Sequence, residues 1–287
     1  METQAMPTQA VAVRHTAEVQ ASIGEVSGEI SGIKLCYAKP TYGVGKQNEL
    51  GFDVGTIVIQ ERYVVATKDA PVPIVIVGVT QVYKDWLGSV EFNAGIKPKR
   101  YLNEAEARAS GKRMDWVDDP SGVVNPATGR PARLGPQIAP IFDVKILIRK
   151  PDMVLDAGKN EVFPSEFFLP IGAEVYCLAV ITMEKMAYLP FFQLLQQSRV
   201  MAAHEQKVAL QDARLHRWLF TLGTQILPSK PGRKSALIPE IKRMQDPTTK
   251  RGALLGPDEV AELENLLGAL TNAQPVAPDA VIDDANP

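Results

Sequence analysis

Cationic and aromatic side chains alternate between residues 84 and 116 of this sequence. Aromatic rings stack on unpaired bases, at about 1 to 3 kcal/mol per base, while Lys and Arg follow the phosphate backbone. The residues that fit such a surface are Lys84, Trp86, Lys97, Lys99, Arg100, Tyr101, Arg113 and Trp116. The pattern favours a groove that binds single-stranded nucleic acid, against the alternative that the rings belong to the core and the charges to an ordinary solvated surface.

A second group of charges lies near the C-terminal end. Between Ser229 and Arg251 seven basic residues face two acidic ones, whereas from Pro257 to Pro287 seven acidic residues face no Lys or Arg. An acidic segment can occupy a cationic site until a polyanion displaces it. We therefore expect Lys242 and Arg243 to form a second wall of the groove. The acidic end would compete for that surface and recruit replication or recombination proteins.

Two motifs for catalysis or metal binding fail on detail. The segment Gly43 to Lys46 is similar to a phosphate-binding loop, but Pro40 replaces its first glycine and Gln47 replaces the Ser or Thr that binds magnesium. His204-Glu205 begins a zinc-protease pattern, yet Val208 stands where the second histidine belongs. We expect neither a nucleotide site nor a metal site here.

Asp115, Asp118 and Asp119 are the nearest approach to a carboxylate cluster, and a loop rich in glycine and proline follows them at once. Such a loop gives no rigid platform for two metal ions. A binding protein without cofactor or metal is therefore the stronger expectation, and an enzyme the weaker.

The composition of the chain limits which classes of protein it can belong to. The chain has 287 residues, 45% of them hydrophobic, and a formal net charge of −2, so it can bury a substantial core. Cys36 and Cys177 each lie in an apolar stretch, which favours buried thiols in a reducing cytoplasm. The apolar run Val72 to Val79 is too short to cross a bilayer. We expect a cytoplasmic protein without a membrane anchor.

Hydrophobic periodicity predicts the elements that position these residues. Three consecutive strands are expected to form an antiparallel meander, and further strands follow after residue 140. A short helix capped by Asn103, a long helix running from Phe191 toward a stop at Gly223, and an acidic helix from Pro257 to Leu270 complete the set. The predicted strands are Gly55 to Ile59, Arg62 to Thr67, Pro73 to Tyr83, Ile141 to Ile148, Ala173 to Met183 and Ala236 to Met244.

The expected fold is α+β: a twisted antiparallel sheet or OB-like Greek-key barrel, with a long helix in the C-terminal half and flexible termini. Residues 1–22 are expected to be a disordered arm because they offer little to bury. Residues 23–250 would form a single nucleic-acid-binding domain with a long loop at 118–135. Residues 251–287 would be an acidic helix and a flexible tail.

Four segments together resemble a known group of proteins. They are Lys39-Pro40-Thr41-Tyr42-Gly43-Val44-Gly45, Gly55-Thr56-Ile57-Val58-Ile59, the strand from Val75 to Tyr83-Lys84-Asp85-Trp86, and Leu189-Pro190-Phe191-Phe192. In their order they resemble bacteriophage-encoded single-stranded DNA-binding proteins with OB-like folds, and phage relatives of unassigned role. The resemblance implies a barrel that protects displaced strands during replication or recombination.

The hypothesis from the sequence is a protein that binds single-stranded DNA or RNA, with DNA favoured, without sequence preference, and that can form a homo-oligomer. The alternative is a virion structural or assembly protein, in which the proline-rich loop and the terminal arms make subunit contacts. Affinity that falls steeply with salt would distinguish the first from the second.

Overall fold

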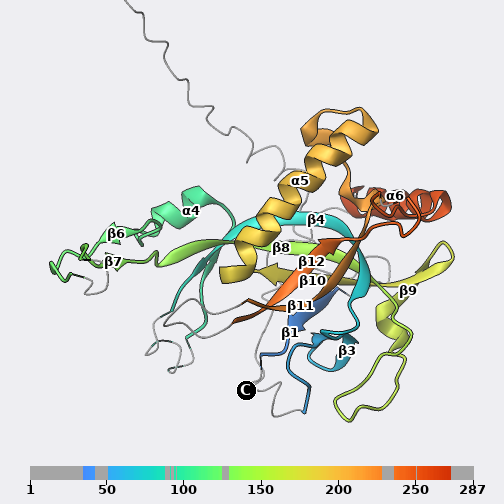
Figure 1. Ribbon diagram of the computed structural model, residues 1–287, viewed down its shortest axis with the longest axis horizontal. Helices are drawn as coiled ribbons and strands as arrows, with labels where there is room; N and C mark the ends of the chain where they lie inside the picture. Colours follow the sequence, from blue (N-terminus) through green and yellow to red (C-terminus); the bar gives the residue numbers. More distant parts are fainter. Residues whose placement is uncertain are drawn as a thin grey trace, which may run out of the picture.

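The structure is a computed structural model that describes residues 35–42, 51–87, 91, 94, 96–124, 129–227, 236–249 and 251–272. Within these residues a mixed sheet of ten strands curls into a half-barrel, helix α5 (Tyr188–Gln206) lies across the sheet, and helix α6 (Pro257–Asn272) lies to one side (Figure 1). The expected α+β class, the barrel-like sheet and the long helix in the C-terminal half are confirmed. The expected arm at residues 1–22 and the end of the tail lie outside the described residues.

The sheet follows one spatial path with two side branches. The path runs β12 (Ala236–Arg243), β11 (Leu219–Leu227), β4 (Val72–Asp85), β8 (Ile138–Arg149), β10 (Glu174–Met183), β1 (Cys36–Pro40), β2 (Ile57–Ile59) and β3 (Tyr63–Ala66). The branches are β5 (Arg100–Tyr101), which pairs with the end of β4, and β9 (Phe168–Ile171), which pairs with β10. Short 3₁₀ helices lie at η1 (Ser165–Phe167), η2 (Lys185–Ala187), η3 (Leu210–Asp212) and η4 (Leu215–Arg217).

The strand order corrects the expected meander. β2 and β3 form the predicted hairpin, and its turn residues Gln60 and Glu61 have φ of 51° and 54°, as a type I′ turn requires. β4, however, pairs with β8 and β11 and lies far along the path from β3. β1 and β10 are parallel, so the sheet is mixed rather than wholly antiparallel. β4 pairs with β8 along almost its whole length, from Ile74 opposite Ile148 to Asp85 opposite Ile138, which the four-residue strand β3 is too short to offer.

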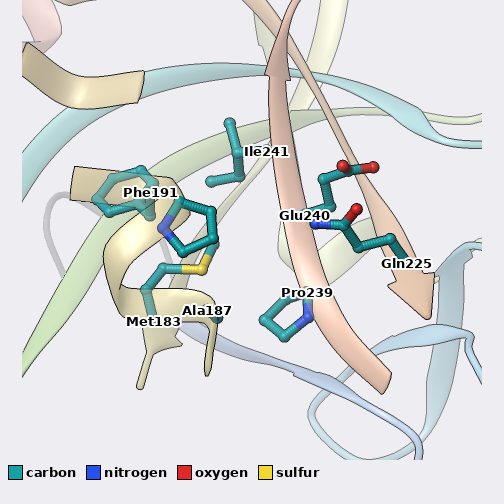
Figure 2. Close-up of a pocket in the computed structure, with 8 residues that line it drawn as sticks. Met183, Ala187, Phe191, Gln225, Pro239, Glu240 and Ile241 are labelled. Carbon is teal, nitrogen blue, oxygen red and sulfur yellow. The ribbon is translucent and has the colours of Figure 1, made fainter. Parts of the chain in front are cut away.

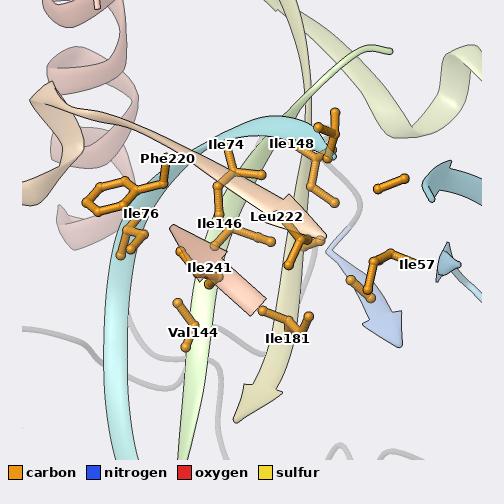
Figure 3. Packing of buried hydrophobic residues seen from close by; sticks show 14 of the residues in the cluster. Ile57, Ile74, Ile76, Val144, Ile146, Ile148, Ile181, Phe220, Leu222 and Ile241 are labelled. Carbon is orange, nitrogen blue, oxygen red and sulfur yellow. The ribbon is translucent and has the colours of Figure 1, made fainter. Parts of the chain in front are cut away.

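Two layers of apolar side chains hold the fold. The inner layer fills the half-barrel with β-branched residues such as Ile74, Ile146 and Ile181 (Figure 3), and α5 closes it with Phe191 and Leu195. The outer layer joins α6 to the opposite face of the sheet, and its members are Val75, Leu147, Ile171, Tyr176, Leu178, Leu219, Leu255 and Leu263. Each face of the central strands is therefore covered by one helix over part of its area.

Cys36 and Cys177 are buried free thiols in the inner layer, as expected. The adjacent Cys36 thiol and burial raise the pKa of Cys177. Both residues therefore act as small apolar side chains in this core.

The long helix is shorter than predicted. It ends at Gln206, and Lys207 caps it in the left-handed conformation with φ of 54°. The apolar residues after Trp218 form strand β11, so the prediction of helix up to Gly223 was wrong. A Cβ on Gly223 would lie 3.2 Å from the Cβ of Pro71, which shows that this glycine permits a close approach of two chain segments instead of ending a helix.

Residues 102–124 and 129–136 belong to an arm that projects from one end of the sheet, at the left of Figure 1. Its helix α4 (Glu104–Ala109) is capped by the Asn103 side chain, as predicted. The expected irregular loop at 118–135 instead carries a small hairpin of β6 (Val117–Asp118) and β7 (Arg133–Leu134). None of the helices that the structure describes has the length and apolarity needed to span a bilayer.

Candidate nucleic-acid interface

The C-terminal end of β4 positions the first predicted binding residues. Gln81 donates a hydrogen bond to the Tyr188 hydroxyl on α5 at 3.4 Å, so the alternation of the strand turns Lys84 toward the opposite, outer face. There the Lys84 ammonium lies 2.7 Å from the Glu184 carboxylate. The Lys185 ammonium lies 4.7 Å from the ring centroid of Trp86, within cation–π distance.

Strands β5 and β8 add two cations to the same face. Arg100 pairs with Lys84 across the β4–β5 ladder, and its guanidinium lies 2.7 Å from the Asp143 carboxylate. Asp143 also accepts a hydrogen bond from the Thr182 hydroxyl at 2.8 Å. Lys145 follows on the same side of β8, and burial lowers its pKa although Asp143 opposes this shift. We call Lys84, Trp86, Arg100, Lys145 and Lys185 the outer cationic patch.

The outer cationic patch keeps a positive balance. It has four cations, and the carboxylates that contact them are Glu184 and Asp143. These ion pairs are partly solvated: the Arg100 side chain is 46% exposed, and those of Lys84 and Glu184 are each 26% exposed. Pairs of this kind contribute about 0 to 1 kcal/mol, so a phosphate group can displace them.

Tyr101 is not available for stacking, which corrects its predicted role. Its side chain is 3% exposed, its hydroxyl donates to Asp85 at 3.1 Å, and the Lys99 ammonium lies 5.0 Å from its ring centroid. The two residues of β5 point to opposite faces, so Arg100 is exposed and Tyr101 is buried. Lys97 and Lys99 are exposed on the segment that leads into β5.

Arg113 and Trp116 lie on the arm and not on the outer cationic patch. The Arg113 side chain donates to the Gly135 carbonyl at 2.8 Å, which ties the two sides of the arm together. Trp116 is 58% exposed, and its ring rests against the backbone of Gly135. Of the predicted rings, Trp116 is therefore the most exposed.

Lys242 and Arg243 do not form a wall opposite Lys84. Arg243 pairs with Phe220, which pairs with Ile74 at the other end of β4. The Arg243 guanidinium stacks 3.8 Å from the Trp218 ring centroid, and burial lowers its pKa. The Lys242 ammonium lies 2.7 Å from Glu240. The prediction of one continuous groove was therefore wrong, because these two residues lie elsewhere on the sheet.

The first part of the acidic segment is bound to the fold. On α6, Glu259 accepts from the Tyr176 hydroxyl at 2.9 Å, and Glu262 accepts from the Gly172 amide at 2.5 Å. Glu264 lies 3.0 Å from Arg217 and 3.1 Å from Arg214. Its three glutamates thus have partners within the domain. The remaining acids of the predicted tail, Asp279, Asp283 and Asp284, lie outside the described residues.

A cavity of about 200 Å³ lies between the start of α5 and β12 (Figure 2). Its walls are mainly apolar, and its lining residues are Met183, Ala187, Pro190, Phe191, Gln225, Pro239, Glu240 and Ile241. Among the residues that the structure describes, no group of three His, Cys, Asp or Glu side chains converges to hold a metal ion. The residues that line this cavity present mainly apolar surface and do not form the pair of acid and base that catalysis needs.

Two members of the outer cationic patch were not among the predicted site residues. Lys145 and Asp143 alternate with apolar residues along β8, and this alternation is the signal that could have identified Lys145. Lys185 begins η2, two residues after the end of β10, with φ of 53°, a conformation that is uncommon for a lysine. Nothing in the local sequence indicated that it would lie over Trp86.

Comparisons of the chain with protein-family models, with curated proteins and with solved structures gave no match.

Proposed function

We propose that the protein binds single-stranded nucleic acid, DNA in the first place, through the outer cationic patch, without sequence preference and without turnover. The observation that carries this proposal is the convergence of Lys84, Arg100 and Lys185 with the Trp86 ring on one face of the sheet. Cations beside a ring are the combination that holds a single strand. We extend the proposal to replication or recombination, the role that the resemblance of four sequence segments to phage single-stranded DNA-binding proteins would imply.

The ion pairs of the patch suggest how binding would proceed. A phosphate replaces Glu184 beside Lys84, or Asp143 beside Arg100, and the freed carboxylate turns to solvent. Lys185 moves from the Trp86 ring to the phosphate, which opens the ring to a base. In each exchange the cation keeps an anionic partner, so its charge stays compensated.

The test is fluorescence anisotropy of a labelled oligonucleotide over a salt series. Binding should weaken with a slope of about −0.7 in log K per phosphate neutralised, as for single strands. Tryptophan fluorescence in a Trp116→Phe background should be quenched through Trp86, since Trp218 is 1% exposed. Binding that is absent, or that does not respond to salt, would exclude this function.

The arm favours a second candidate, an assembly protein. Several of its large apolar side chains are exposed, among them Trp116, Val117, Val123 and Val124. A two-stranded hairpin is marginally stable alone, so a covering partner would stabilise it. Sedimentation over a range of concentrations tests this candidate. Self-association that persists in high salt and is lost in Trp116→Ser would support assembly over nucleic-acid binding.

A further inference from the structure

Three aromatic rings lie parallel where α5 crosses the half-barrel. The Phe142 ring of β8 is 4.8 Å from the Tyr188 ring and 6.2 Å from the Phe192 ring, and Tyr188 and Phe192 are 6.2 Å apart. The angles between the ring planes are 6°, 8° and 3°. Phe142 is buried, Tyr188 is half-buried, and Phe192 is 36% exposed, so the group extends from the core to the solvent.

Local structure holds these rings in place. Tyr188 and Phe192 are four residues apart on α5, which puts them on the same side of the helix. The Phe191 ring meets Phe142 edge-on, at 5.5 Å and 65°, and fixes it from the core side. Gln81 donates to the Tyr188 hydroxyl at 3.4 Å. A surface fixed in this way loses little side-chain entropy when another ring stacks on it.

We propose that Tyr188 and Phe192 form a stacking platform for unpaired bases, and that this platform restricts the ligand to single strands. The proposal rests on the proposed function. A flat ring face accepts only a base that has left the stack of a duplex, whereas the cations of the outer patch attract single and double strands alike. The platform therefore supplies the discrimination that charge alone does not.

Continuity along the chain connects the platform to the outer cationic patch. Lys185 in η2 contacts Trp86, and Tyr188 begins α5 three residues later. Glu184, the partner of Lys84, immediately precedes η2. One short segment thus carries both of these contacts and the first ring of the platform. Because the patch lies on the outer face and Tyr188 on the face that α5 covers, a bound strand has to follow this segment around the end of β10 for its bases to reach the platform.

The Phe192 ring has a plainer interpretation, as an apolar side chain that covers the edge of the hydrophobic core. That role needs an apolar side chain but not a flat ring, so Phe192→Leu separates the two interpretations. The matched control is Leu189→Ala, because Leu189 lies on the same helix, is 57% exposed and has no ring. Phe192→Tyr keeps the ring and serves as the rescue variant.

The experiment measures the affinity of the full-length variants for a single strand that contains 2-aminopurine, and for the matching duplex. Phe192→Leu should bind the single strand about 5- to 150-fold more weakly, the range for one lost stack, while Phe192→Tyr and Leu189→Ala retain affinity. Quenching of 2-aminopurine should decrease in Phe192→Leu, since only Trp86 and Tyr188 then remain to stack on a base, and duplex affinity should not change. Circular dichroism should show that all three variants fold.

The outcomes separate the two proposals. If the wild type binds single strands and Phe192→Leu binds and quenches equally well, the platform is excluded and the proposed function stands. If the wild type binds no oligonucleotide, both proposals fail. A Phe192→Leu variant that loses affinity equally for single strands and duplex also overturns the discrimination assigned to the platform.

Discussion

The ammonium of Lys112 lies 2.6 Å from the carboxylate of Asp85, a side chain that is only 5% exposed. The other carboxylate oxygen accepts a hydrogen bond from Tyr101 at 3.1 Å. Asp85 is the last residue of β4, whereas Lys112 follows α4, so this buried carboxylate fastens the arm to the sheet. The hydrogen bond to Asp85 raises the pKa of Lys112.

Replacing Asp85 should therefore loosen the arm. Asp85→Asn keeps the size of the side chain but removes the charge that satisfies Lys112 and Tyr101, and we expect it to lower the free energy of unfolding by about 1 to 3 kcal/mol. Urea denaturation measures the loss, and limited proteolysis should cut first within residues 102–136. Glu104→Gln, which removes the charge of the exposed pair with Arg108 and leaves an oxygen that can still accept from the Tyr83 hydroxyl, should cost less than about 1 kcal/mol.

The position of the binding surface can be tested with two lysines. Lys185→Gln should weaken oligonucleotide binding and reduce the salt slope by about 0.7, because it removes one phosphate contact from the outer cationic patch. Lys242→Gln, at the opposite end of the sheet, should leave both quantities unchanged. Anisotropy titrations over a salt series measure both. A larger effect of Lys242→Gln would restore the groove expected from the sequence.

Local features of the fold were predictable from the sequence, and its long-range pairing was not. The Asn103 cap, the strand around Val75 and the helix beginning at Pro257 depend on neighbouring residues, and all three are present. The pairing of β4 with β8 over β3 depends on which apolar surfaces fit together, which no local pattern contains.

The candidate site shows the same limit. Alternation in β4 indicates that Lys84 and Tyr83 face opposite ways, but it does not show which face α5 covers. Tyr101 and Trp116 have similar sequence surroundings, yet the first is buried under the arm and the second is exposed on it. The contact of Lys185 with Trp86 joins two segments about a hundred residues apart, and only the fold brings them together.

Acidification should destabilise the fold through His216. Burial lowers the pKa of His216, although Glu264 opposes the shift. As pH falls below about 6.5, the unfolded chain takes up a proton that the folded chain does not, so the free energy of unfolding decreases until the folded pKa is reached. Urea midpoints between pH 5.5 and 8 should show this decrease. His216→Gln should abolish this decrease in stability. His204→Gln, at an exposed histidine, is the control for replacing a histidine by glutamine.

The packing of α6 should respond to a single truncation. Leu263 is 1% exposed and lies in the outer layer with Val75 and Leu147. Leu263→Ala leaves a cavity there, and we expect a loss of about 2 to 5 kcal/mol in the free energy of unfolding, measured by urea denaturation. Asp258→Ala, an exposed change at the start of the same helix, should stay within about 0.5 kcal/mol. Equal effects of the two variants would show that α6 contributes little to the domain.

Removal of residues 273–287 should strengthen oligonucleotide binding. This segment carries Asp279, Asp283 and Asp284, whereas Glu259, Glu262 and Glu264 are held by partners in the fold. If the three aspartates compete for the outer cationic patch, their loss raises affinity at low salt, and the gain fades as screening increases. Anisotropy titrations of the full-length and shortened proteins at several salt concentrations measure the gain. A shortened variant of equal affinity at every salt concentration would show that the acidic end does not compete, and an Asp279→Asn, Asp283→Asn, Asp284→Asn variant of full length separates the effect of charge from that of length.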